Sequence, residues 1–497
     1  MDNRRDFLKK ASLLSGGAGL LNVLPSSIAR AMAIDPAPGS TFYDAEHIVF
    51  LMQENRSFDH TYGTLQGVRG FNDPRAITLP GNNSVWCQTD SNGNMYAPFR
   101  LDIKNTNATW MESLPHSWTD QVDARNDGKY DKWLDHKRSG VEEYKSMPLT
   151  LGFYSREDIP FYYSLADAFT VCDHNFCSSL TGTTPNRLYF WTGTIREKQH
   201  AEAQANVWNE DADNERNVEW KTFPERLEEN DISWKVYQNE IGVNSGLKDE
   251  YDSWLGNFGD NPLEYFAQYK VSSKPEELSG TTKSINEKAF TTNKKDPNYH
   301  ELESLKYDDG GTAREVQVPK GDTFFQFRED VKSGNLPTVS WLVAPQQFSD
   351  HPSSAWYGAW YISEALDILT QNPEVWKKTV FILTYDENDG YFDHVPPFVA
   401  PHPTKKGTGA VSPGIDTSTE FVSSESQQSH KGERARISPI GLGYRVPMVI
   451  ASPWSRGGFV NSQVFDHTSS LQFLEKFLSK KYKKKIHEPN ISEWRRT

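Results

Sequence analysis

A run of hydroxyl side chains just before a proline is the first candidate for chemistry. The run is Thr181-Gly-Thr-Thr-Pro-Asn-Arg187, and it follows an apolar stretch, residues 168–172, that is typical of a buried strand. Proline is favoured in the first turn of a helix and threonine at its cap, so we expect Thr183 and Thr184 at a helix N-terminus. The N–H groups and dipole there attract anions such as phosphate. The run indicates either a nucleophile beside an anion site or an ordinary capped helix.

Hard oxygen ligands follow two other apolar runs. Residues 47–52 lead into Glu54 and Asn55, and residues 379–384 lead into Asp386 and Glu387. In α/β sheets chemistry collects where strand C-termini meet loops, and such ligands suit a hard cation. Two adjacent carboxylates after a buried strand are also costly unless something positive lies nearby. The alternative is that both places are polar turns, the first with Ser57 as a helix cap.

Several other polar residues have short local motifs. His116 stands in Pro-His-Ser and His351 in Asp-His-Pro, and a single histidine in such a setting is usually structural. Asp466 and His467 precede the helical pattern of residues 470–479, which favours a capping role. The lysine-rich run at 480–485 is typical of a solvated surface.

The elements that must position these residues form an α/β pattern. The chain has 497 residues and a formal net charge of -14, which argues against nucleic acid as a partner. Further strands are expected at 233–237, 338–343 and 445–451, and helices at 261–269 and 360–371. Residues 196–330 are polar and irregular, and within them residues 272–311 have the composition of a surface excursion.

The N-terminus has the features of an export signal. Arg4 and Arg5 form a twin-arginine motif, a glycine-broken apolar stretch follows, and small residues before residue 34 offer cleavage patterns. We therefore expect residues 1–33 to be a signal for the Tat machinery, with residues 34–497 as one catalytic domain. The alternative is a short membrane anchor. Cys172 and Cys177 either pair after export or remain buried thiols.

Five motifs taken in order give the chain a family resemblance. It resembles the bacterial phosphocholine-type phospholipase C family, which includes some acid phosphatases and belongs to the alkaline phosphatase superfamily. The resemblance covers residues 44–497, and its motifs are Gln53-Glu-Asn-Arg-Ser-Phe-Asp-His60, Thr181-Gly-Thr-Thr-Pro-Asn-Arg187, Tyr385-Asp-Glu-Asn-Asp-Gly-Tyr-Phe-Asp-His-Val-Pro-Pro397, Arg445-Val-Pro-Met-Val449 and Phe465-Asp-His-Thr-Ser469.

The resemblance implies a fold and a site. The fold would be an alkaline-phosphatase-like three-layer sandwich, with a mostly parallel central sheet and helices on both faces. Thr183 would be the nucleophile, with Thr184 as the helix cap beside it, and His116 and His351 would contact the phosphoryl group or leaving oxygen. Asp393 and His394 are weaker candidates for such a role, and the alternative is that their run only shapes the loop. One divalent metal ion, with Ca, Mg, Mn and Zn all open, would be held by Glu54, Asn55, Thr183, Asp386 and Glu387.

The implied activity is that of a periplasmic or secreted phospholipase C. It would hydrolyse phosphatidylcholine-like diesters through a covalent phospho-threonine, with transient contact to a membrane surface. The first alternative is a periplasmic acid phosphatase acting on phosphomonoesters, and the second is a non-catalytic lipid- or choline-binding protein. Many phospholipases of the family continue into small C-terminal β-rich modules, and this sequence stops near where those would begin. This stopping point strengthens the alternative that the substrate is a soluble phosphomonoester, relative to what the motifs alone imply.

Overall fold

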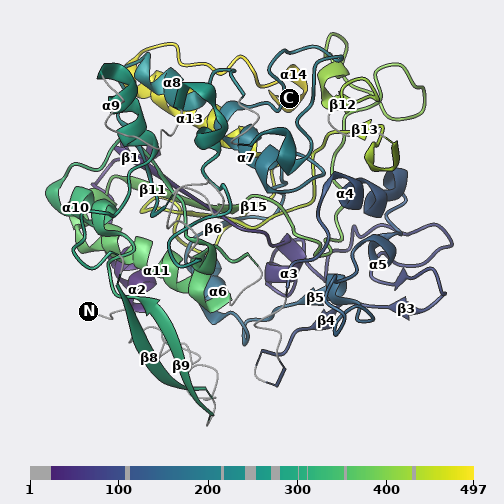
Figure 1. The fold of residues 1–497 in the computed structure, drawn as a ribbon, viewed down its shortest axis with the longest axis horizontal. Helices are drawn as coiled ribbons and strands as arrows, with labels where there is room; N and C mark the ends of the chain where they lie inside the picture. The colour runs from purple at the N-terminus through teal and green to yellow at the C-terminus, as the bar shows by residue number, and fades with distance from the viewer. Residues whose placement is uncertain are drawn as a thin grey trace.

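A seven-stranded sheet crosses the molecule, and its strands come from distant parts of the sequence (Figure 1). In the computed structural model the strand order is β15-β6-β14-β11-β1-β10-β7. Only β14 runs antiparallel to its neighbours in this sheet. The predicted mostly parallel sheet is confirmed. The strands, in the same order, are Val460–Asn461, Thr170–Cys172, Met448–Ala451, Thr379–Tyr385, His47–Gln53, Val339–Leu342 and Trp234–Tyr237.

The structure describes most of the chain, with several gaps. The described residues are 24–103, 105–106, 112–213, 218–240, 253–269, 280–299, 301–309, 312–351, 355–427 and 432–496. The twin arginines of the predicted export signal therefore lie outside the described residues. Within the described residues, no helix is both long enough and apolar enough to cross a membrane.

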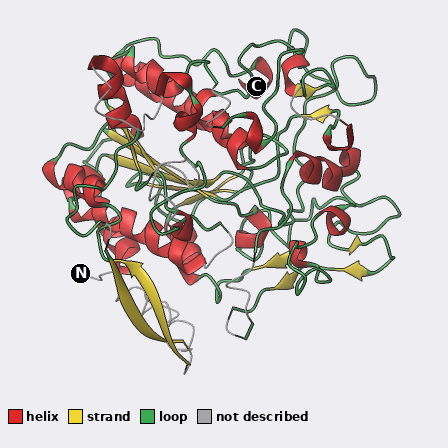
Figure 2. Cartoon of the chain, in the orientation of Figure 1, coloured by secondary structure: helices red, strands yellow, loops and turns green. Residues whose placement is uncertain are grey.

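Helices cover both faces of the sheet (Figure 2). The side chains of β1 alternate between the two layers: Val49 and Leu51 pack in one apolar core, and Ile48, Phe50 and Met52 pack in the other. The predicted three-layer α/β arrangement is confirmed. The first core is covered by α2 (Ser26–Ala33), α6 (Pro160–Ala168), α10 (Phe325–Ser333) and α11 (Ala355–Gln371), and the second by α7 (Thr183–Thr192), α8 (Phe223–Glu228), α9 (Gly280–Ala289) and α13 (His467–Tyr482).

Further elements complete the fold. They include a two-stranded hairpin of β8 and β9, which projects from the body in Figure 1. The remaining helices and strands are α3 (Phe58–Tyr62), α4 (Trp118–Arg125), α5 (Trp133–His136), α12 (Pro373–Trp376), α14 (Glu493–Arg496), β2 (Gln88–Thr89), β3 (Met95–Tyr96), β4 (Phe99–Arg100), β5 (Gly152–Phe153), β8 (Leu302–Asp309), β9 (Thr312–Pro319), β12 (Phe421–Val422) and β13 (Ser438–Pro439).

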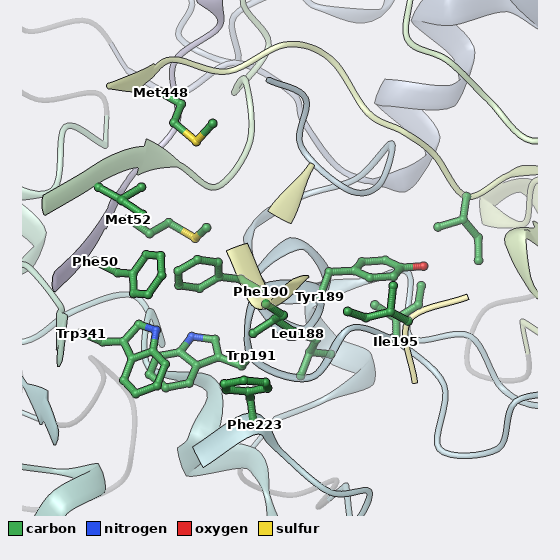
Figure 3. Packing of buried hydrophobic residues seen from close by; sticks show 14 of the residues in the cluster. Phe50, Met52, Leu188, Tyr189, Phe190, Trp191, Ile195, Phe223, Trp341 and Met448 are labelled. Atoms are coloured by element: carbon green, nitrogen blue, oxygen red, sulfur yellow. The ribbon is translucent and has the colours of Figure 1, made fainter. Parts of the chain in front are cut away.

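Aromatic packing fixes α7 against the sheet. Figure 3 shows Phe190 facing Phe50 and Trp191 beside Trp341. The ring centroids of the first pair are 5.5 Å apart in an edge-to-face arrangement, and those of the second pair are 4.7 Å apart and stacked. Such pairs add to the stabilisation from burying the rings. The second half of α7 is therefore held against β1 and β10.

Helix α2 lies within the predicted export signal and yet packs into the core. Ile28 and Ala31 are fully buried. The indole N–H of Trp376 donates to the carbonyl of Ala31 at 3.0 Å, and Arg30 pairs with Asp367 on α11 at 2.7 Å. The signal boundary at residue 33 stays a prediction, but residues 26–33 are an ordered part of this fold.

Two local expectations have clear outcomes. The helix expected over 261–269 is wrong, because Phe266 adopts an extended conformation and separates two short 3-10 helices, Pro262–Tyr265 and Ala267–Tyr269. Cys172 and Cys177 are buried free thiols, which was one of the two alternatives left open by the sequence.

Candidate active site

The N-terminus of α7 presents the candidate nucleophile. Thr183 is the first residue of the helix, and only 6% of it is exposed. The prediction that Thr184 is the cap is wrong: Gly182 occupies the N-cap position, and Thr184 is the second helical residue. The backbone N–H of Thr184 instead donates to Oδ1 of Asn209 at 3.0 Å, so a side chain from another segment satisfies that donor.

One arginine joins this helix to both predicted ligand loops. Arg187 lies one turn after Thr183, on the same helix face. Its Nη2 donates to Oε1 of Glu54 at 2.9 Å, and its Nε donates to Oδ2 of Asp386 at 3.1 Å. Its Nη1 donates to the carbonyl of Asp260 at 3.1 Å. The structure therefore brings the ends of β1 and β11 together under the start of α7.

The carboxylates of this cluster outnumber its cations. Glu54, Asp260, Asp386 and Glu387 are all buried, and Arg187 is the one cation that pairs with them directly among the described residues, apart from His116. Burial raises the pKa of Glu54 well above its usual value, and Asp260 and Asp386 raise it further. Burial likewise raises the pKa of Glu387 to about 8. Such an excess of buried negative charge calls for protons or a bound cation.

Buried oxygens without a hydrogen bond identify where a cation fits. Glu54 Oε2, Glu387 Oε1 and both polar atoms of the Asn55 amide are buried without a hydrogen bond among the described residues, and so is Asp260 Oδ1. Buried polar groups are normally paired. Carboxylate and amide oxygens are the donors that hard divalent cations take. The residues present therefore fit the predicted metal, and Asp260 adds a carboxylate that the sequence motifs did not single out.

His116 lies beside the nucleophile and the ligand loop. A Cβ added to Gly182 would lie 3.4 Å from Cδ2 of His116. Nδ1 of His116 is 2.9 Å from Oδ1 of Asp389, and Nε2 is 3.9 Å from Oε1 of Glu387. Burial lowers the pKa of His116, but Glu387 and Asp389 outweigh it and raise the pKa to about 10. His116 is thus a protonated acid at neutral pH, and 21% of its side chain is exposed.

Asp389 is a site residue that the sequence analysis missed. Its φ of 54° is in the left-handed region, which is uncommon for a non-glycine residue. Its Oδ1 also accepts from the backbone N–H of Leu114 at 2.9 Å, so it fixes the loop that carries His116. The sequence feature that could have identified Asp389 is its position within the motif, two residues after Glu387 and just before Gly390.

His351 lies close to His116 but in a different protonation state. Burial lowers the pKa of His351 to about 3, with His116 and Arg56 adding to the effect. Its ring centroid is 4.2 Å from that of Phe258. The imidazole is therefore neutral, held by an aromatic contact from the polar segment that follows α8. The structure places both predicted histidines at the same site.

Neighbouring strands and helices position the ligand loops. The backbone N–H of Asp386 donates to the carbonyl of Gln53 at 3.1 Å, which extends the β1–β11 pairing into the loops. His467, predicted in a capping role, is the first residue of α13, and its Nε2 lies 2.6 Å from the carbonyl of Asp386. Asp466 is the N-cap, as predicted. Helix α13 thus both begins at and supports the Asp386 loop.

A second group of metal-ligand types lies nearby but is already paired. Asp59, Asp393 and His394 are buried with potential ligand atoms within 4.8 Å of one another. Arg445 donates to Oδ1 of Asp59 at 3.0 Å and to Oδ1 of Asp393 at 2.8 Å, and His394 Nδ1 is 2.6 Å from Asp59 Oδ2. The guanidinium supplies the positive charge there. This cluster joins the motifs at 53–60, 385–397 and 445–449, which supports a loop-shaping role for Asp393 and His394.

Comparison with known proteins gives a consistent set of relatives. A model of the phosphoesterase family matches residues 45–479. The chain is 41% and 40% identical to the non-hemolytic phospholipases C of Burkholderia pseudomallei and Pseudomonas aeruginosa, over 99% of this chain and 63% and 62% of theirs. It is 33% identical to phospholipase C B of Mycobacterium tuberculosis, over 99% of this chain and 83% of that protein. The chain thus spans less than two thirds of the length of the first two relatives.

Proposed function

Since this chain belongs to the phosphoesterase family, we propose that it is a phosphoric ester hydrolase, specifically a phospholipase C. Its substrates would be phosphatidylcholine-like phosphodiesters, and its products diacylglycerol and a phosphorylated head group. The observation that carries the proposal is the set of buried oxygens without a hydrogen bond on Glu54, Asn55 and Glu387 beside the start of α7. The names of the relatives support phospholipase C over the phosphomonoesterase alternative.

A divalent cation fits this site. When bound, it would lower the pKa of the nucleophile's hydroxyl and neutralise phosphoryl charge. The oxygen donors do not choose between Ca, Mg and Mn, and Zn remains open. The residues that would hold it are Glu54, Asn55, Thr183, Asp386 and Glu387.

The side chains then divide the reaction into two displacements. Thr183, its hydroxyl proton lost to solvent, attacks phosphorus, and the bond to the diacylglycerol oxygen breaks. His116 donates a proton from Nε2 to that leaving oxygen. His116 then takes a proton from water as the water attacks phosphorus, and the bond to Thr183 breaks. Thr183 leaves as the alkoxide and regains its proton from solvent, and release of the phosphorylated head group then leaves both residues in their starting states.

Activity assays on matched variants test the proposal. Thr183→Ala should lower turnover of phosphatidylcholine by at least about 1,000-fold, because the covalent route is lost. Thr184→Ala is the control, since the Thr184 side chain has no proposed role, and it should keep activity within a few-fold. If the protein turned over p-nitrophenyl phosphate strongly and phosphodiesters not at all, the phospholipase C proposal would be wrong and the phosphomonoesterase alternative would stand. Full activity of Thr183→Ala would refute the nucleophile.

We also propose that the protein is exported by the Tat machinery to the periplasm or beyond and contacts a membrane surface transiently. Arg4 and Arg5 support this route. Replacing both with lysine should leave the full chain in the cytoplasm of a Tat-competent host, as measured by cell fractionation. Unchanged export of that variant would contradict the route.

A further inference from the structure

A fully buried lysine lies behind the candidate active site. Lys137 follows the short helix α5, and 1% of it is exposed. Among the described residues, no carboxylate lies within ion-pair distance of its Nζ. Burial lowers the pKa of Lys137 to about 8, and Asp120, Glu387 and Asp389 act in the opposite direction. A buried lysine without a direct ion pair is rare in proteins, so its contacts need an explanation.

The ammonium group binds two segments of the site. Nζ of Lys137 donates to the carbonyl of Pro115 at 2.8 Å, directly before His116. It also donates to Oε1 of Gln121 at 2.7 Å. Hydrogen bonds from a charged donor are stronger than neutral ones. The first of these bonds therefore fixes the backbone of the His116 loop.

Gln121 carries the connection to the other side of the site. Its Nε2 donates to Oδ1 of Asn388 at 2.8 Å and to the carbonyl of Asp389 at 3.0 Å. Because Lys137 occupies the amide oxygen, the amide nitrogen of Gln121 must face the 386–391 loop. The two loops are thus joined through one buried cation and one buried amide, and Gln121 itself is 1% exposed.

We propose that Lys137 is a positioning residue, which sets the placement of His116 relative to Glu387 and Asp389 through Pro115 and Gln121. The expected loss of turnover rests on the proposed function, whereas the anchoring of the two loops by Lys137 does not. Without the ammonium group the Pro115 carbonyl and the Gln121 amide oxygen would both lose their donor. Gln121 could then rotate, and the two loops would lose their shared anchor. A displacement of about 1 Å at a catalytic group can cost about 100-fold in rate.

Two variants and a control test this role. Lys137→Met keeps the length and burial of the side chain but removes the donors. Gln121→Glu keeps a partner for Lys137 but removes the donors to Asn388 and Asp389. Lys235→Met is the control, because Lys235 lies on the edge strand β7 and pairs with Asp330 of α10 rather than with these loops.

Turnover and amide exchange are the two readouts. With a soluble short-chain phosphodiester, both site variants should lose about 100-fold in kcat with KM within a few-fold, while Lys235→Met stays near wild type. Hydrogen exchange should rise in the peptides covering 112–118 and 386–392 in both site variants and not in the control. The exchange readout needs no turnover, so it tests the inference even if the wild type proves inactive and the proposed function fails. Wild-type exchange in both peptides of Lys137→Met would overturn the inference, as would wild-type kcat in an active enzyme.

Discussion

Replacing Arg187 with methionine should make the stability of the protein depend strongly on divalent cations. Arg187 is buried and pairs with Glu54 and Asp386 within 3.1 Å. Although burial lowers its pKa, Asp260, Asp386 and Glu54 raise the pKa overall, so the guanidinium is a permanent positive charge in the cluster. Its loss would leave three buried carboxylates without their cation.

The size of the effect follows from the geometry. Breaking a buried ion pair by removing one partner costs about 3–5 kcal/mol. For a domain of this size the unfolding entropy is roughly 1 kcal/mol per kelvin, so Tm should fall by about 3–5 °C in chelator. A cation at about 1,000 times its Kd contributes about 4 kcal/mol. Since the variant's carboxylates have lost their competing guanidinium, the cation should raise its Tm by more than it raises that of wild type.

The assay is thermal unfolding in chelator and then with excess divalent cation. Arg196→Met is the matched control, because Arg196 is also buried and donates to the backbone carbonyls of residues 201, 203, 419 and 421. It should lose stability equally in both conditions. If the cation raised the Tm of Arg187→Met no more than that of Arg196→Met, Arg187 would not compete with the cation for these carboxylates. If it raised the Tm of neither variant, the cluster would not be a cation site.

Three further predictions concern the site and the fold. His116 acts as an acid below its raised pKa and loses that role as pH rises through that pKa. Asp389→Asn removes a bond worth about 1.5–3 kcal/mol, so it should move the alkaline limb of kcat down by roughly 1–2 pH units. An unmoved limb would show that Asp389 does not hold the His116 proton. Deletion of residues 1–33 should lower Tm measurably relative to deletion of residues 1–24, because only the first removes α2, and equal Tm values would show that α2 is dispensable. Arg445→Met should lower Tm by about 3–5 °C with no rescue by divalent cations, and rescue would make the Asp59 cluster a second metal site.

The strands and the ligand loops could be predicted because their signals are local. The apolar runs that lead to Glu54 and Asp386 are continuous, and a continuous apolar run is typical of a strand that is buried on both faces. The expected positions at the same sheet edge followed from parallel topology alone. The N-terminus of α7 was predictable in the same manner, from threonine and proline chemistry.

The remaining features depend on contacts between distant segments. Thr184 resembles a cap in sequence, but the Asn209 side chain reaches its N–H from another segment. Asp260 sits in the polar and irregular stretch of residues 196–330, and only the fold brings it to Arg187. Lys137 has no motif of its own, since its partners are a backbone carbonyl and an amide. Local patterns carry none of this information.

The metal content of the purified full chain tests the central claim most directly. The protein would be equilibrated with Ca, Mg, Mn and Zn, freed of unbound metal and analysed by mass spectrometry of the elements, beside a Glu54→Gln/Glu387→Gln variant that keeps the shape of both side chains. We expect about one divalent cation per wild-type chain and none retained by the variant. A metal-free wild type that turns over phosphodiester, or equal metal content in the two proteins, would contradict the assignment of the site.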